Sequence, residues 1–153
     1  WVYIISEIVL SFGYFLVVSG VLKDLFISKI VGKKSGDKLN IALITFNQEG
    51  KGTYLRAYFL GEELIKLGHK VTILAADIDG NHTHERIENG MKIVTFPRFF
   101  KGFFLSGWGF GELIHRLYWI RDNEFDLVHA FECRPTTYFP ARQLQKRGAA
   151  FFT

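Results

Sequence analysis

The pattern of apolar and polar residues between positions 39 and 76 predicts a strand, a helix and a second strand. Residues 39–46 are almost all apolar, as in a strand that is covered on both faces of a sheet. From residue 54 to residue 67 the apolar positions recur with helical spacing, and Gly68 is suited to end that helix. Residues 71–76 are apolar again. Two strands joined by a helix lie parallel in one sheet, and such sheets bind ligands at the carboxyl ends of their strands.

The rest of the chain repeats this pattern and predicts a larger sheet of the same kind. Residues 77–88 are polar and rich in turn formers, so they are expected to form a loop before a strand at 91–96. A helix is expected over 112–121, with strands at 126–130 and 149–153 and a helix between them. The apolar residues of the 112–121 helix are expected to face inward: Leu113, Ile114, Leu117, Tyr118 and Ile120. The predicted fold class is α/β, a Rossmann-like doubly wound parallel sheet.

Residues 1–34 do not fit this sheet and are expected to form an apolar helical segment. Residues 1–22 carry one charge, Glu7, and lysines follow at positions 23, 29, 33 and 34. About 20 apolar residues are enough for a helix to span a bilayer, and the lysines would place its C-terminal side in the cytoplasm. The alternatives are the tail of a preceding domain or an upstream stretch foreign to the protein. Residues 35–38 are the expected linker, and residues 39–153 the α/β domain.

Composition narrows the partners and the setting. The chain has 48% hydrophobic residues and a net charge of +4, so it is not a disordered chain and favours anionic partners such as nucleotide phosphates or lipid headgroups. No nucleic-acid recognition motif is visible. The single cysteine, Cys133, excludes an internal disulfide and a multi-cysteine metal site. We expect a cytoplasmic location, at the inner face of the plasma membrane if the first segment is an anchor.

The loop between the first strand and the first helix holds the candidate ligand site, Gly50, Lys51, Gly52 and Thr53. Backbone N–H groups and the positive end of the helix dipole make this position receptive to a phosphate or a carboxylate. A nicotinamide-binding motif would need a third glycine and a tighter turn, although Asp77 could serve as its ribose-binding acid. The acids of a receiver domain and the triphosphatase loop are absent.

Residues 98–110 alternate basic and aromatic residues. They would contact a membrane surface, an acceptor with a lipid tail or single-stranded nucleic acid, or pack on this or another domain. The candidates for membrane contact are Arg98, Phe99, Phe100, Lys101, Phe103 and Phe104. Two histidines, His82 and His84, have a spacing that can bind a metal on a strand. Because no carboxylate or cysteine cluster completes that site, we expect a solvated loop and no metal.

Three runs of sequence resemble a known family. They are residues 49–57, residues 60–74, and residues 125–132 with Arg134, Pro135 and Thr136 after them. In this order and spacing, residues 39–153 resemble the N-terminal Rossmann half of a GT-B fold, retaining glycosyltransferase of the family 4-like group. Because the chain starts at Trp1 and ends in a strand with no helix after it, we expect it to be part of a longer protein.

The resemblance implies a role for two sets of residues. Gly50, Lys51, Gly52 and Thr53 would lie under the diphosphate of a nucleotide-sugar donor, and an acceptor-side cleft would include His129, Phe131, Glu132 and Arg134. Some relatives carry a histidine at the position of Phe131, so no catalytic residue is assigned.

The resemblance also implies the partners. The acceptor would be a glycan or a lipid-linked glycan, and no cofactor or metal would be needed. The carboxylates that hold the donor would belong to a C-terminal Rossmann domain, so this chain alone should not transfer sugar. The open alternatives are a GT-B-like epimerase, a nicotinamide-binding domain and a non-catalytic membrane-tethered module.

Overall fold

The computed structural model describes residues 37–98 and 106–153 of the chain. The chain divides into two compact units, residues 1–37 and residues 38–153, and every described helix and strand lies in the second unit. The apolar segment expected at residues 1–34 lies outside the described residues. Among the helices that the structure describes, none is long and apolar enough to cross a membrane.

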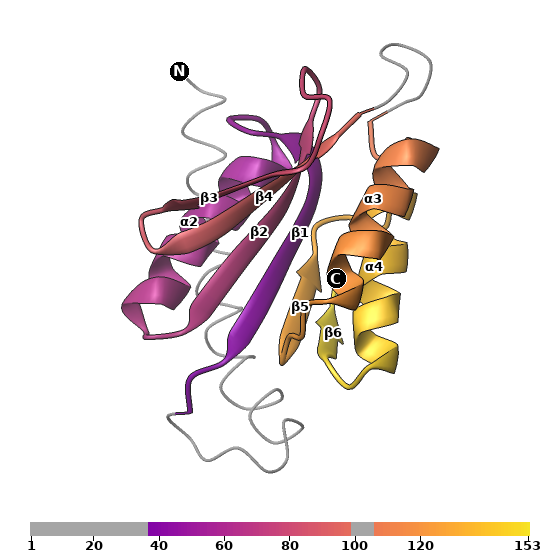
Figure 1. Cartoon of the computed structure of the whole chain (residues 1–153). Coiled ribbons are helices and arrows are strands. Elements are labelled where there is room, and N and C mark those ends of the chain that lie inside the picture. Colours follow the sequence, from indigo (N-terminus) through magenta and orange to yellow (C-terminus); the bar gives the residue numbers. More distant parts are fainter. Residues whose placement is uncertain (1–36, 99–105) are drawn as a thin grey trace. The chain divides into compact units, whose positions relative to one another are not determined.

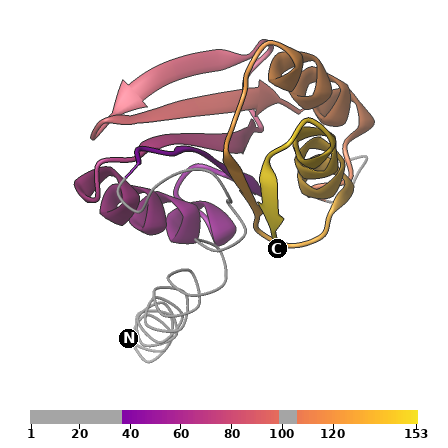
Figure 2. The ribbon, with the colours of Figure 1, turned by 90° about the horizontal axis from the view of Figure 1, so that it is seen from below.

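Six strands form one sheet in the order β3-β4-β2-β1-β5-β6. All neighbours are parallel except β3 and β4, which are antiparallel. The strands are β1 (Asn40–Gln48), β2 (Lys70–Asp77), β3 (His84–Glu88), β4 (Met91–Pro97), β5 (Leu127–Ala130) and β6 (Ala150–Phe152). Three helices, α2 (Thr53–Lys66), α3 (Phe110–Arg121) and α4 (Pro135–Lys146), connect them. Figures 1 and 2 show α2 on one face of the sheet and α3 with α4 on the other.

This arrangement confirms the predicted Rossmann-like α/β fold and locates its switch point. The chain moves from β1 outward through β2 to β4, then returns to the other side of β1 to form β5 and β6. The strand order therefore reverses between β1 and β5. In open α/β sheets, ligands bind in the crevice outside the carboxyl ends of the strands at such a point.

The expectation of a loop over residues 77–88 is wrong in its second half, because residues 84–88 form the edge strand β3. This strand pairs antiparallel with β4 through the Asn89-Gly90 turn, whose φ angles of 48° and 79° are both left-handed. A two-residue turn of this kind matches the twist of a hairpin. Four of the five residues of β3 are exposed, so the strand has no apolar run by which to be recognised.

The inward face predicted for α3 is also wrong in part. Ile120 is buried as expected, but Ile114 and Tyr118 are 48% and 67% exposed. The buried positions one and two turns earlier are instead Glu112 and Arg116, which form an ion pair of 2.7 Å. Each charge compensates the other, so the helix buries two residues that polarity alone would place in solvent.

The core on the α3 and α4 side of the sheet combines strand and helix residues. Its members come from β1, β2, β4 and β5, from both helices and from the turn before β6: Ala42, Ile44, Leu74, Val94, Phe96, Ile120, Val128, Ala130, Ala141, Leu144 and Ala149. On the other face, Gly61 lets α2 approach the sheet closely, because a Cβ there would lie 2.5 Å from the sulfur of Met91. This packing holds the carboxyl ends of the strands in fixed positions.

Candidate active site

Three parts of the chain meet at the switch point: the end of β1, the segment after β5 and the residues before α3. Arg134, the N-cap of α4, lies in the second of these and contacts the other two. Its guanidinium group is 3.8 Å from the centre of the Phe46 ring at the end of β1. Its Nη1 donates to the carbonyl oxygen of Ser106 at 2.6 Å, and its Nε donates to Glu132 at 3.2 Å. Cation–π, carbonyl and carboxylate contacts thus fix this arginine at the switch point.

Glu132 and Gly107 show how closely the chain is fitted around this arginine. Glu132 adopts φ = 69°, which is uncommon for a residue other than glycine, and its carbonyl oxygen accepts from the Thr137 hydroxyl. Gly107 has φ = 82°, and a Cβ there would lie 2.5 Å from Cδ of Arg134 and 3.0 Å from Cβ of Phe46. A conformation such as that of Glu132 persists only where the surroundings determine it, as at binding sites.

The glycine loop after β1 has the geometry of an uncapped helix start. Gly50 has φ = 73°, and Gly52, the N-cap of α2, has φ = 45° and ψ = −117°. No side chain caps the first turn of α2. The backbone N–H of Tyr54 donates to the carbonyl oxygen of Lys51 at 2.9 Å, whereas the N–H groups of Gly52 and Thr53 have no partner within the helix and are suited to a bound anion. Lys51, at the tip of the loop, is exposed.

Thr53 has a different environment from the rest of this loop. Its side chain is buried, and its hydroxyl group makes a hydrogen bond with the hydroxyl group of Thr45 on β1. The hydroxyl group is therefore engaged inside the domain, and the group that Thr53 offers to a ligand is its backbone N–H. The side chain of Asn47 packs directly against Gly52. A Cβ on Gly52 would lie 2.2 Å from the side-chain nitrogen of Asn47, so only glycine fits there.

Glu49, which precedes the loop, is neutralised by the edge strand. Both of its carboxylate oxygens accept from the guanidinium group of Arg86 on β3, the second at 2.8 Å. Arg86 also contacts Glu88 at 3.0 Å, and hydrogen bonding to Glu49 is the main cause of its raised pKa. Burial, with the nearby charge of Glu49, raises the pKa of Tyr54 to about 12. The start of the glycine loop is thus tied to the β3–β4 hairpin.

His129 lies inside β5, opposite Leu43 of β1, and not at the end of the strand. It is 5% exposed, with its ring stacked 4.2 Å from Phe131 and edge-on to Phe152 at 4.7 Å. Burial lowers the pKa of His129 to about 4. The imidazole is therefore neutral at pH 7.

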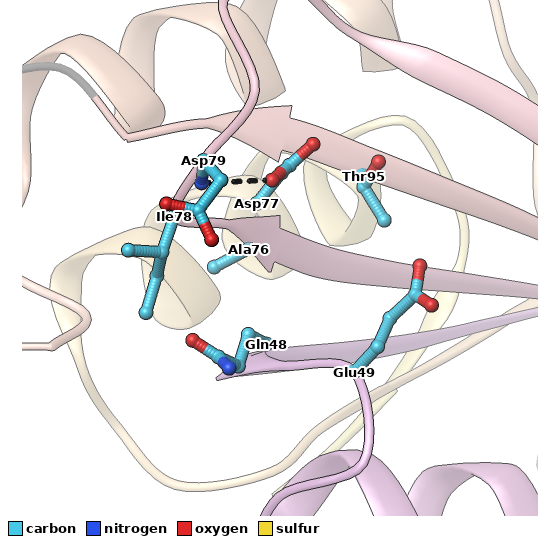
Figure 3. Close-up of a pocket in the computed structure, with 7 residues that line it drawn as sticks. All are labelled: Gln48, Glu49, Ala76, Asp77, Ile78, Asp79 and Thr95. Carbon is cyan, nitrogen blue, oxygen red and sulfur yellow. Dashed lines mark hydrogen bonds between the residues drawn. The ribbon is translucent and has the colours of Figure 1, made fainter.

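A cavity of about 270 Å3 opens next to Glu49, at the carboxyl ends of β1, β2 and β4. Its lining residues are Gln48, Glu49, Ala76, Asp77, Ile78, Asp79 and Thr95. Figure 3 shows these side chains arranged around the opening, with polar groups from all three strands. Oδ1 of Asp77 accepts from the backbone N–H groups of Asp79 at 3.0 Å and of Gly80 at 2.8 Å, so this oxygen closes its own turn.

Of the candidate membrane residues, the structure describes only Arg98. Its backbone N–H donates to the carbonyl oxygen of Asp77 at 2.9 Å. Phe99, Phe100, Lys101, Phe103 and Phe104 lie outside the described residues. Next to them along the chain, large apolar side chains are exposed on α3 and just before it: Trp108, Phe110, Ile114 and Tyr118.

The two histidines considered as metal ligands lie side by side, with ring centres 4.2 Å apart. Across residues 37–98 and 106–153, no three His, Cys, Asp or Glu side chains converge in a way that could hold a metal ion.

Several residues at the site escaped the sequence analysis. Arg86 belongs to a strand that was not predicted, and Arg116 was not among the residues expected to face inward from its helix. Phe46 was identified only as a core residue of the first strand. The one usable signal was the i,i+4 spacing of Glu112 and Arg116, which is typical of an ion pair on one helix face.

The fold and these loops define the class of the protein. It is a Rossmann-like domain whose glycine loop follows β1 and whose Arg134 follows β5, on the two sides of the switch point. The sequence profile of Glycosyltransferase Family 4 matches residues 52–152, well over half of the chain. The chain therefore belongs to this family, and the resemblance drawn from three sequence runs is confirmed. Comparisons with curated proteins and with solved structures gave no match.

Proposed function

We propose that this domain takes part in the transfer of a sugar from a nucleotide-sugar donor, and that the loop Gly50–Thr53 binds the donor diphosphate. The observation that carries the proposal is the uncapped start of α2 behind two left-handed glycines, at the switch point of a family 4 domain. Backbone N–H groups and the helix dipole favour a diphosphate there without any metal or cofactor.

The electrostatics of the neighbouring residues support this assignment. Glu49 would repel a diphosphate if its charge were free, but Arg86 pairs with both of its oxygens. Lys51 is exposed and adds a positive charge at the tip of the loop. During transfer, negative charge develops on the departing diphosphate, and fixed N–H groups aimed at that charge lower the barrier.

The acceptor is assigned to the remaining polar surface at the same edge of the sheet. Glu132 and Arg134 form one candidate wall, and the buried, stacked rings of His129 and Phe131 lie in the segment that leads to them. The cavity beside Glu49 offers a second wall, with amide, hydroxyl and carboxylate groups that hydrogen-bond to sugar hydroxyls. The proposal expects the donor-binding carboxylates to come from a second Rossmann domain, so this domain alone should not transfer sugar.

We also propose that the acceptor is lipid-linked and that the protein works at an anionic membrane surface on the cytoplasmic side. The supporting observation is the exposed stripe Phe110, Ile114 and Tyr118 on successive turns of α3, with Arg121 one turn further on. Apolar side chains flanked by basic residues suit the interface of an anionic bilayer.

Flotation with vesicles of phosphatidylglycerol and phosphatidylcholine tests this second proposal. Replacing the three stripe residues with serine should reduce the fraction of protein that floats. A Leu55→Ser/Phe59→Ser variant, which removes exposed apolar residues from α2, is the matched control and should float like the wild type. Equal flotation of both variants and the wild type would refute the assignment.

The donor loop is tested by calorimetry on the full-length gene product with UDP, GDP and ADP. Gly50→Asp places a carboxylate beside the diphosphate, in a position where a Cβ meets nothing within 4 Å. Gly148→Asp is the matched control, because Gly148 is also left-handed, is also free of neighbours within 4 Å and lies between α4 and β6. We expect Gly50→Asp to weaken binding at least about tenfold and Gly148→Asp to leave it unchanged. Equal affinities for both variants would show that the loop does not bind the diphosphate.

A further inference from the structure

The residues beneath the glycine loop contain a bulge in β1. The strand pairs regularly with β2 from Asn40 to Ile44, and the register has shifted where Gln48 meets Ala76. A bulge interrupts the ladder and turns the strand, and bulges are common beside active sites. Here the carbonyl oxygen of Thr45, inside the irregular segment, accepts a hydrogen bond of 2.8 Å from Nη2 of Arg116. A side chain from α3 therefore supplies the donor to this carbonyl.

Arg116 is held in the core by two neighbours. It is fully buried, forms an ion pair of 2.7 Å with the equally buried Glu112, and lies 5.2 Å from the centre of the Phe96 ring. Its Nε and Nη1 have no hydrogen-bond partner among the described residues. Apolar residues of similar size often replace such a pair without loss of stability. Stability alone therefore does not account for two charges at this place.

The carbonyl that Arg116 holds belongs to the residue that organises the loop. The hydroxyl group of Thr45 bonds to the hydroxyl group of Thr53, the first residue of α2, and accepts from the backbone N–H of Asn47 at 3.2 Å. Asn47 in turn packs under Gly52, where even a methyl group would overlap its side chain. The hydrogen bond from Arg116 to Thr45 therefore affects the loop at both ends, through Asn47 before it and through Thr53 at the start of α2.

We propose that Arg116, with its charge balanced by Glu112, is a positioning residue that holds the β1 bulge so that the glycine loop presents its N–H groups to the diphosphate. The ligand in this statement rests on the proposed function, whereas the ordering of the loop does not. Arg116 lies beneath the loop and acts on the ligand only through Thr45, Thr53 and Asn47.

The test uses Glu112→Leu/Arg116→Met, because removing both charges together leaves no unpaired charge in the core. Hydrogen exchange of the full chain is read at the amides of Asn47, Lys51 and Tyr54, which are hydrogen-bonded in the loop. We expect these amides to exchange at least about tenfold faster than in the wild type, with the amides of Ile73 and Val94 in the core unchanged.

Two further variants keep the test decisive. Arg147→Met is the matched control, because it removes another arginine-to-carbonyl bond, of 2.6 Å to Ile120, at the far end of α3. It should leave the loop amides unchanged. Nη2 of Arg116 alone contacts both Glu112 and the carbonyl oxygen of Thr45. Arg116→Lys keeps a charge opposite Glu112, but the lysine side chain ends one bond short of the position of Nη2, so it should also speed exchange in the loop.

Loop amides that exchange as in the wild type in both Arg116 variants would overturn the proposal. Nucleoside diphosphate affinity, measured with UDP and GDP, separates this result from a failure of the proposed function. We expect at least about a tenfold loss in the double variant. A wild type that binds neither nucleotide, but whose loop loses protection in the variants, would retain the positioning role and refute the diphosphate as ligand.

Discussion

His129 should make the stability of the domain depend on pH in a defined window. Burial lowers its pKa to about 4 in the folded state, whereas a histidine in the unfolded chain titrates near 6.5. Between these values the unfolded chain binds a proton that the folded domain does not. The contribution of His129 to the free energy of unfolding is therefore fully present above pH 6.5 and is lost as the pH falls toward 4. At about 1.4 kcal/mol for each pH unit between about 6.5 and about 4, the loss is about 3 kcal/mol.

The assay is thermal unfolding of the wild type and of His129→Leu at pH 7, 6, 5 and 4. Leucine is compatible with the aromatic neighbours Phe131 and Phe152, and it does not titrate. For a domain of this size, about 3 kcal/mol corresponds to about 10 °C in Tm. The wild type should lose about 10 °C more than the variant between pH 7 and pH 4. An equal decrease in both proteins would show that the histidine is not buried in a neutral form.

Two further predictions concern the elements that the sequence analysis did not recognise. Arg116→Met alone removes the ion-pair partner of the buried Glu112, so it should cost about 3–5 kcal/mol in chemical denaturation, while the double variant stays close to the wild type. If the single and the double variant lost the same free energy of unfolding, Glu112 and Arg116 would not be a mutually compensating buried pair. Gly90→Val forces a branched residue to φ = 79° in the hairpin turn and should cost about 1–2 kcal/mol. A Tm equal to that of the wild type would mean that the turn does not require the left-handed conformation.

Most of the fold follows from local sequence patterns. The buried strands β1, β2 and β4 are continuous apolar runs, and α2 shows its stripe through Ala57 and Gly61. The glycines that end helices are visible because only they adopt left-handed angles without cost. These signals depend on neighbouring residues alone, so they can be read without knowledge of the tertiary structure.

The elements that were missed depend on contacts made across the fold. The edge strand β3 has mostly exposed residues, and its pairing with β4 was indicated only by Asn89 and Gly90. The face of α3 was misjudged because the burial of Arg116 requires both Glu112 and the carbonyl of Thr45, which is 71 residues away along the chain. No property of the helix by itself predicts that contact.

The candidate site shows the same division. Gly50 and Gly52 were identified from their position between a strand and a helix, and the structure gives both of them left-handed angles. The place of Arg134 over the ring of Phe46 was not predictable, because these residues meet only when β5 lies next to β1. Sequence reasoning identified the loops of the site but not the contacts that hold them together.

The central claim is that the loop after β1 binds the donor diphosphate, and amide chemical shifts test it most directly. Titration of the isotope-labelled full-length gene product with UDP or GDP should shift the backbone amides of Gly50, Gly52 and Thr53. The amide of Gly148, another left-handed glycine, should not move. The assignment would be contradicted if the nucleotide changed the chemical shifts of other amides but left those of Gly50, Gly52 and Thr53 unchanged.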